Sequence, residues 1–133
     1  MRVSLEGRMS TFGGPHDTGM GPNEGLALID SHNLGDFGQL FLAEQPPGTT
    51  GLARRLNPEA FYIACRWDYQ VTPKVDLLKS KATVTNPANG KSAQAQPVDL
   101  GPAESTGRVA DLSPGLAAFL QLQTDGVVQV TLD

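Results

Sequence analysis

"VDLGPAESTGRVADLSPGLAAFL", residues 98–120, is the stretch that decides the fold. It carries two aspartates, Asp99 and Asp111, with a Gly-Pro turn between them. Ser113 is a favoured N-cap residue, and the proline after it suits the first helical position. Apolar residues then recur at helical spacing, which predicts a short amphipathic helix just after Asp111. These apolar residues are Leu112, Leu116, Phe119 and Leu120.

The segments on either side of this stretch are typical of short β-strands. KATVTN (81–86) alternates apolar and polar residues, PANG (87–90) ends in a strong hairpin signal, and KSAQAQPV (91–98) supplies the return strand. Pro97 has no N–H to donate, so we expect it at an edge or a bend. After TDG, the segment VVQVTLD (127–133) predicts a final strand. Many short strands favour a mostly β fold, a small barrel, over a doubly wound sheet.

The first part of the chain, residues 1–50, predicts a loop-rich elaboration. STFGGPHDTGMGPNEG (10–25) is dense in glycine and proline, which predicts a surface loop after a short strand near residues 10–12. GLALID (25–30) is a candidate strand. A length of 133 residues predicts one domain, 1–133, with the barrel core over 60–132. Long irregular segments within a compact domain are often binding loops.

Composition excludes several classes of function. The net charge of −4 and the absence of a basic stripe argue against nucleic-acid binding. Cys65 is the one cysteine, so neither an intrachain disulfide nor a cysteine-based zinc site is expected. His16-Asp17 and Asp30-Ser31-His32 match no zinc spacing, so we predict no metal and no cofactor.

No segment has the apolar length of a membrane span, and the N-terminus has no apolar region of the kind that signal peptides carry. The expectation is therefore synthesis in the cytoplasm. Three alternatives stay open. The protein stays in the cytoplasm, it is exported by another route to the periplasm, the exterior or a virion, or a leader has been removed from it.

Four motifs in order resemble the double-psi β-barrel domain of rare lipoprotein A, a fold shared by expansins and family 45 endoglucanases. They are VTNPANGKS, VDLGP, TGRVADLSPGLAAFL and DGVVQV, spread over residues 60–132. STFGG also resembles the opening A-S-W-Y-G strand of that family. The resemblance implies a six-stranded double-psi barrel with one or two short helices. It also implies a groove that binds polysaccharide, which in rare lipoprotein A is peptidoglycan and which some members cleave as lytic transglycosylases.

The resemblance assigns roles to both aspartates. Asp99 matches the aspartate of N-D-R-G-P, which is functionally important in the transglycosylase members. Asp111 matches the aspartate of D-L-S, where the endoglucanases carry their general acid. The alternative for Asp111 is structural, because an aspartate before a helix start can accept backbone N–H groups. We favour that alternative and keep Asp99 as the candidate functional carboxylate.

Other family carboxylates have no counterpart here. The pattern G-E-x-x-D-P leading to T-A-A-H aligns with RRLNPEAFYIACR, which puts Arg54, Asn57 and Arg66 where Glu, Asp and His are expected. An arginine stays protonated and an asparagine does not titrate, so acid/base catalysis by the full set is not expected.

Candidate ligand contacts come from two segments. Strand alternation puts Phe61, Ile63, Cys65 and Trp67 on a core face and Tyr62, Ala64, Arg66 and Asp68 on a face that lines a groove. The substrate-binding candidates are Tyr62, Arg66, Asp68, Thr106 and Arg108.

Three functions follow from these observations, all in a bacterial or phage setting. The expected one is a non-catalytic module that binds cell-wall glycan or takes part in assembly. The second is a peptidoglycan-cleaving enzyme that uses Asp99 and Asp111, with a loop carboxylate such as Glu24. The third is a structural component of a phage tail or secretion apparatus, with protein partners.

Overall fold

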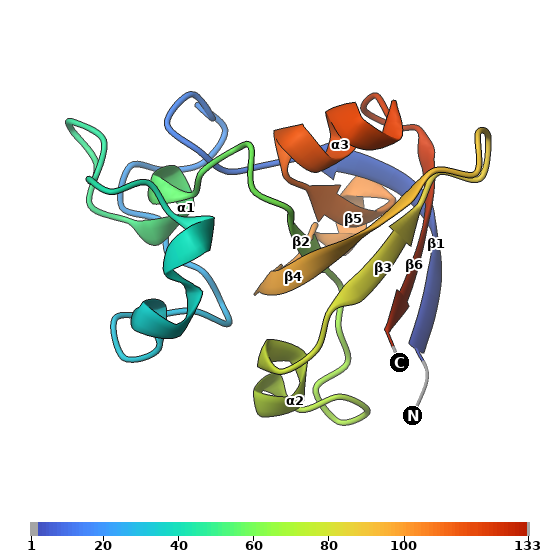
Figure 1. Cartoon of the computed structure of the whole chain (residues 1–133), viewed down its shortest axis with the longest axis horizontal. Coiled ribbons are helices and arrows are strands. Elements are labelled where there is room, and N and C mark those ends of the chain that lie inside the picture. Colours follow the sequence, from blue (N-terminus) through green and yellow to red (C-terminus); the bar gives the residue numbers. More distant parts are fainter. Residues whose placement is uncertain (1–2, 133) are drawn as a thin grey trace.

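The computed structural model describes residues 3–132 and shows a closed barrel of six strands with a loop-rich lobe beside it (Figure 1). The order around the barrel is β1-β5-β2-β4-β3-β6. The strands are β1 (Val3–Thr11), β2 (Tyr62–Cys65), β3 (Ala82–Thr85), β4 (Ser92–Leu100), β5 (Arg108–Leu112) and β6 (Val127–Leu132). Closure leaves no unpaired sheet edge, which removes the usual template for edge-to-edge aggregation. The prediction of a six-stranded, mostly β barrel is confirmed.

The strand pairing has an internal twofold symmetry. β1 pairs in parallel with β5 and β2 in parallel with β4, while the other four ladders are antiparallel. Exchanging β1, β2 and β3 for β4, β5 and β6 leaves every neighbour and every strand direction unchanged. The barrel thus consists of two topologically equivalent halves. Membership of the double-psi family stays a prediction.

Helices close the two ends of the barrel (Figure 1). α3 (Pro114–Leu120) lies over one end and buries Leu116 and Leu120, while α2 (Lys74–Leu78) lies at the other end and buries Leu77. With α1 (Leu52–Arg55) and the 3₁₀ turns η1 (Leu34–Leu40) and η2 (Glu104–Thr106), the short helices outnumber the one or two expected. The barrel interior is filled by alternate residues of every strand, including Met9, Ile63, Cys65, Val84, Val98, Ala110, Leu112, Val128, Val130 and Leu132.

The predicted hairpin explains two asparagines of the family-like motif. β3 and β4 pair from Ala82 with Ala95 to Thr85 with Ser92, and Pro97 lies beyond that ladder, beside a register shift. From the connecting turn, the side-chain amides of Asn86 and Asn89 donate to the carbonyl of Leu120, at 2.8 and 3.1 Å. Since the last carbonyls of a helix lack intrahelical partners, these contacts complete the end of α3.

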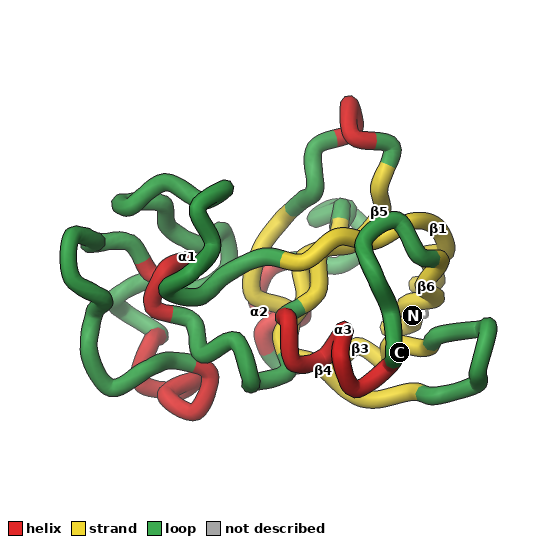
Figure 2. Tube along the Cα trace, turned by 90° about the horizontal axis from the view of Figure 1, so that it is seen from above, coloured by secondary structure: helices red, strands yellow, loops and turns green. Residues whose placement is uncertain are grey.

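The N-terminal lobe, residues 12–61, is tied to the outer wall of the barrel rather than to its interior (Figure 2). The Leu28 N–H donates to the Val98 carbonyl at 3.2 Å, and the Gly115 N–H donates to Pro58 at 2.7 Å. The candidate strand at 25–30 is wrong: this segment is irregular, although Leu28 and Ile29 are buried. Its apolar residues pack against the barrel wall without joining the sheet, because the barrel is already closed.

Candidate functional site

The two aspartates lie on one row that crosses four adjacent strands. Ser10 of β1 pairs with Asp111 of β5, Asp111 pairs with Ala64 of β2, and Ala64 pairs with Asp99 of β4. Paired residues on neighbouring strands place their side chains on the same face. The residues on either side of Asp111 on β5, Ala110 and Leu112, are buried in the barrel, so the row faces outward. Asp99 and Asp111 are thus two strand spacings apart, about 9.5 Å between Cα atoms.

Asp99 links the lobe to the barrel through its hydrogen bonds. Its Oδ1 accepts the N–H of Ala27 at 2.8 Å and the N–H of Leu100 at 2.9 Å, and its own carbonyl accepts from the Trp67 indole at 3.0 Å. Burial raises the pKa of Asp99, the two amide hydrogen bonds oppose that rise, and the charge of Glu24 adds to it. Contrary to expectation, the aspartate favoured for function is the one with structural contacts.

Asp111 differs from Asp99 in its hydrogen bonds. It is half-buried, and its carboxylate makes no hydrogen bond within residues 3–132. Burial raises its pKa to about 6, the nearby Arg108 opposes the rise, and the charges of Asp99 and Asp17 increase it. A carboxyl group with such a pKa is partly protonated near neutral pH, which is the property that a general acid needs.

The structural role expected for Asp111, to accept backbone N–H groups at the start of α3, is wrong. The side-chain hydroxyl of Ser113 accepts the N–H of Leu116 at 3.2 Å, and Ser113 is the N-cap of α3. Asp111 lies two residues earlier, inside β5, where the outward direction of its side chain carries it away from the helix start. Capping therefore does not account for an aspartate at this position.

Two further carboxylates reach the row from the lobe. Asp17 accepts the N–H groups of Gly13 and Gly19 at 2.7 and 2.9 Å, and Glu24 accepts the N–H of Gly21 at 3.2 Å. Asp17 acts electrostatically on Asp111, and Glu24 acts on Asp99. Within residues 3–132, no group of three His, Cys, Asp or Glu side chains is placed to hold a metal ion. Among the described residues, Arg108 is the cation that opposes the effect of these carboxylates on Asp111.

A cavity of about 500 Å³ opens at the end of β1, and its lining includes none of the four row residues. Thr11, which follows Ser10, forms one wall, and Asp17 forms another. Gly13 and Gly14 have φ values of +88° and +97°, which residues with a Cβ rarely adopt, and they let the chain turn sharply into the lobe. The complete lining is Thr11, Phe12, Gly13, Gly14, His16, Asp17, Thr18, Pro58 and Pro114.

The residues that replace the expected family carboxylates have structural contacts of their own. Arg54 donates to the carbonyls of Met20 and Pro15, at 3.0 and 3.3 Å, and so braces the lobe. Asn57 accepts the N–H of Glu59 at 3.1 Å in a turn. Arg66 lies 3.9 Å from Glu104, a loose and largely exposed ion pair.

The predicted ligand contacts do not form one groove. Tyr62 is 0% exposed and donates to the Phe12 carbonyl at 2.8 Å, so the expectation that it lines a groove is wrong. The lobe covers this face of β2, and both faces of the strand are therefore buried. Asp68 is exposed and accepts the N–H of Gln70, at 2.9 Å, in a turn.

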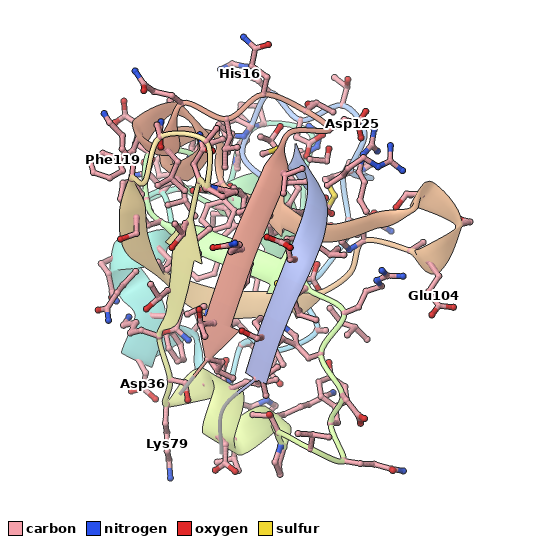
Figure 3. The ribbon with its side chains drawn as sticks, turned by 90° about the vertical axis from the view of Figure 1, so that its right-hand side faces the viewer. His16, Asp36, Lys79, Glu104, Phe119 and Asp125 are labelled. Atoms are coloured by element: carbon pink, nitrogen blue, oxygen red, sulfur yellow. The ribbon has the colours of Figure 1, made fainter. Side chains whose placement is uncertain are left out.

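Thr106 and Arg108 lie at the β4–β5 connection, which projects away from the barrel near Glu104 (Figure 3). Thr106 accepts the N–H of Arg108 at 3.1 Å. Arg108 donates from Nε to Asp125 at 2.8 Å, and Arg8 shares the same carboxylate at 3.2 Å. Of the predicted binding residues, only Arg108 therefore has an electrostatic connection to Asp111.

Sequence reasoning did not single out Ser10, and it named Ala64 only as part of a face expected to line a groove. The alternation of β1 and β2 signals the outward direction of these residues, but strand order is needed to bring them together. No protein-family model matches the chain, and no curated protein matches it as a relative. No helix within residues 3–132 combines the length and the apolar character needed to cross a membrane.

Proposed function

We propose that this protein cleaves glycosidic bonds of cell-wall glycan, with Asp111 as the one acid/base group. The observation that carries the proposal is a half-buried Asp111 that has no hydrogen-bonded partner among the described residues and a pKa of about 6. Perturbed carboxyl groups of this kind concentrate at functional sites, since a folded protein gains no stability from them. The resemblance to rare lipoprotein A supports peptidoglycan as the glycan.

A single carboxyl group is sufficient for transglycosylation within the substrate. Protonated Asp111 donates its proton to the glycosidic oxygen as the bond from that oxygen to C1 breaks. The ionised carboxylate then takes the proton of the 6-hydroxyl group of the same sugar, whose oxygen forms a new bond to C1. No water is consumed, and Asp111 regains its proton. The products are a shortened chain with an anhydro sugar end and a free hydroxyl on the leaving sugar.

Hydrolysis by a carboxylate pair is less well supported. It requires a second carboxylate to activate water or to attack the sugar. Oδ1 of Asp99 is engaged by two backbone N–H groups, and the family positions for other carboxylates hold Arg54 and Asn57.

The second candidate is the non-catalytic glycan-binding module. The observation in its favour is that Asp99, Asp17 and Glu24 all accept backbone N–H groups, so none of these three described carboxylates is free to act as a partner for Asp111. On this alternative the cavity beside Thr11 holds a sugar and no bond is cleaved.

Digestion of purified peptidoglycan sacculi separates these possibilities. The proposal expects soluble muropeptides with anhydro ends, lighter than hydrolysis products by one water on a mass spectrometer. Asp111→Asn abolishes their release, while Asp36→Asn, at an exposed carboxylate of η1 in the lobe, leaves it unchanged.

Two outcomes would overturn the proposal. Retention of the wild-type protein on sacculi without product release supports the binding module. If the protein is not retained on sacculi and releases no product, a glycan substrate is ruled out and the assembly role remains.

A further inference from the structure

Ser10 and Ala64 are the two register partners of Asp111 on the outward face, and Ser10 is the one with a hydroxyl group. Ser10 and Asp111 are register partners in the parallel ladder between β1 and β5, with Met9 and Ala110 as the preceding, buried pair. Register partners that share a face have Cβ atoms about 5 Å apart, which is within the reach of a hydroxyl and a carboxylate. Ser10 is half-buried, and its hydroxyl has no hydrogen-bonded partner within residues 3–132.

The twofold symmetry of the strand order shows how Ser10 fits into the row. When the two halves of the barrel are exchanged, the row Ser10–Asp111–Ala64–Asp99 maps onto itself in reverse. Ser10 therefore holds the position equivalent to Asp99, and Asp111 the position equivalent to Ala64. Ala64 has no polar group, so only at the Asp111 end of the row does a hydroxyl adjoin a carboxylate.

We propose that Ser10 is a positioning residue for Asp111. The two side chains are not hydrogen-bonded in the structure; when Asp111 is ionised, rotation of the Ser10 side chain lets its hydroxyl donate a hydrogen bond to the carboxylate. A serine hydroxyl has one donor and two acceptor positions, and so accepts from the protonated acid and donates to its anion. The bond to the anion is charge-assisted and is the stronger of the two. Ser10 thus fixes the direction of the carboxyl group through both halves of a proton-transfer cycle.

The other charged and titratable groups around Asp111 do not supply this contact. Arg108 on β5 donates to Asp125, Asp99 on β4 accepts from Ala27, and Asp17 in the lobe accepts from two glycine N–H groups. Cys65 on β2 points into the barrel with a pKa raised first by burial and then by the charge of Asp111. Ser10 is the neutral donor on the neighbouring strand.

The pairing can be tested by following the Asp111 side-chain carboxyl carbon in a pH titration by NMR. This readout needs no activity, so it separates failure of the pairing from failure of the proposed function. Ser10→Ala raises the titration midpoint of Asp111 by about one pH unit, because the anion loses a charge-assisted hydrogen bond. Ser10→Thr keeps the hydroxyl and restores the midpoint. Ser4→Ala, an exposed serine on the same strand, leaves it unchanged.

Two results would overturn the pairing. One is an unchanged midpoint in Ser10→Ala. The other is an equal displacement in Ser10→Ala and Ser10→Thr, which would show that packing and not the hydroxyl matters. Amide spectra confirm that each variant is folded.

The role of Ser10 in the reaction rests on the proposed function. If sacculi are cleaved, Ser10→Ala raises the pH above which activity falls. The rise equals the change in the titration midpoint of Asp111. A displaced midpoint without any cleavage keeps the pairing and rejects the enzyme.

Discussion

Asp111→Asn is expected to make the protein more stable at pH 8 and to change its stability little at pH 3.5. Burial raises the pKa of Asp111 from 3.8 to about 6, a rise of about two units. A group with a raised pKa in the folded state favours folding below its unfolded pKa and loses that contribution as pH rises through the folded value. Above about pH 6 the ionised Asp111 carboxylate therefore destabilises the folded state. The neutral amide of asparagine does not have this effect.

The size of this effect follows from the shift. Each pKa unit corresponds to about 1.4 kcal/mol, so two units correspond to about 3 kcal/mol for a fully enclosed group. Because Asp111 is only half-buried, solvent screening reduces the expected gain to about 1–2 kcal/mol at pH 8. The gain grows between about pH 4 and pH 6 and is constant above that range.

Urea unfolding at several pH values measures the gain directly. At pH 8 the midpoint of Asp111→Asn rises by about 0.5–1 M urea relative to the wild type. Asp125→Asn is a control of opposite sign. The hydrogen bond from Arg108 lowers the pKa of Asp125, so this variant loses stability as the pH rises above the acidic range. A variant Asp111→Asn that is less stable at every pH would refute the reasoning and assign Asp111 a structural role.

Three further variants, one of them with a matched control, test the packing of the lobe and its attachment to the barrel. Gly51→Ala places a Cβ 2.1 Å from the Glu24 carbonyl oxygen and lowers the free energy of unfolding by about 2–4 kcal/mol in urea titrations. The control Gly25→Ala has open space around its Cβ and changes the free energy of unfolding by less than about 1 kcal/mol. Tyr62→Phe leaves the Phe12 carbonyl without its donor and lowers the melting temperature, at a cost of about 1–2 kcal/mol; an unchanged melting temperature contradicts that hydrogen bond. Asp99→Asn weakens the anchor of the 25–28 loop, and hydrogen exchange at the Ala27 amide speeds up about tenfold if that contact holds the loop.

Local signals in the second half of the chain predicted its elements well. Asn89-Gly90 predicts the hairpin and Ser113-Pro114 predicts α3, because each depends on neighbouring residues. The first half was harder, since β1 has nine residues but only its end was recognised. Its outward positions carry Ser4, Glu6 and Arg8, which alternate with Val3, Leu5 and Met9. This period of two is typical of a half-buried strand, so the sequence does hold a signal for the rest of β1.

The contacts of the two aspartates differ from those expected. Asp99 stood apart from any helix start and therefore looked available, but the Ala27 amide that occupies it comes from 72 residues away. Asp111 stood near Ser113 and looked like a cap, but its strand turns its side chain outward. The carboxylates that act on Asp111 come from β4 and from the lobe, and no spacing along the chain reveals that arrangement.

By itself, the sequence determined the short strands, the hairpin, the helix after Ser113 and a mostly β fold, because turn chemistry, capping and alternation act over a few residues. Only the tertiary structure decided that Ser10, Asp111, Ala64 and Asp99 form one row, since that row depends on the order and register of four strands. The same is true of the raised pKa of Asp111, which arises from burial and from charges distant in sequence.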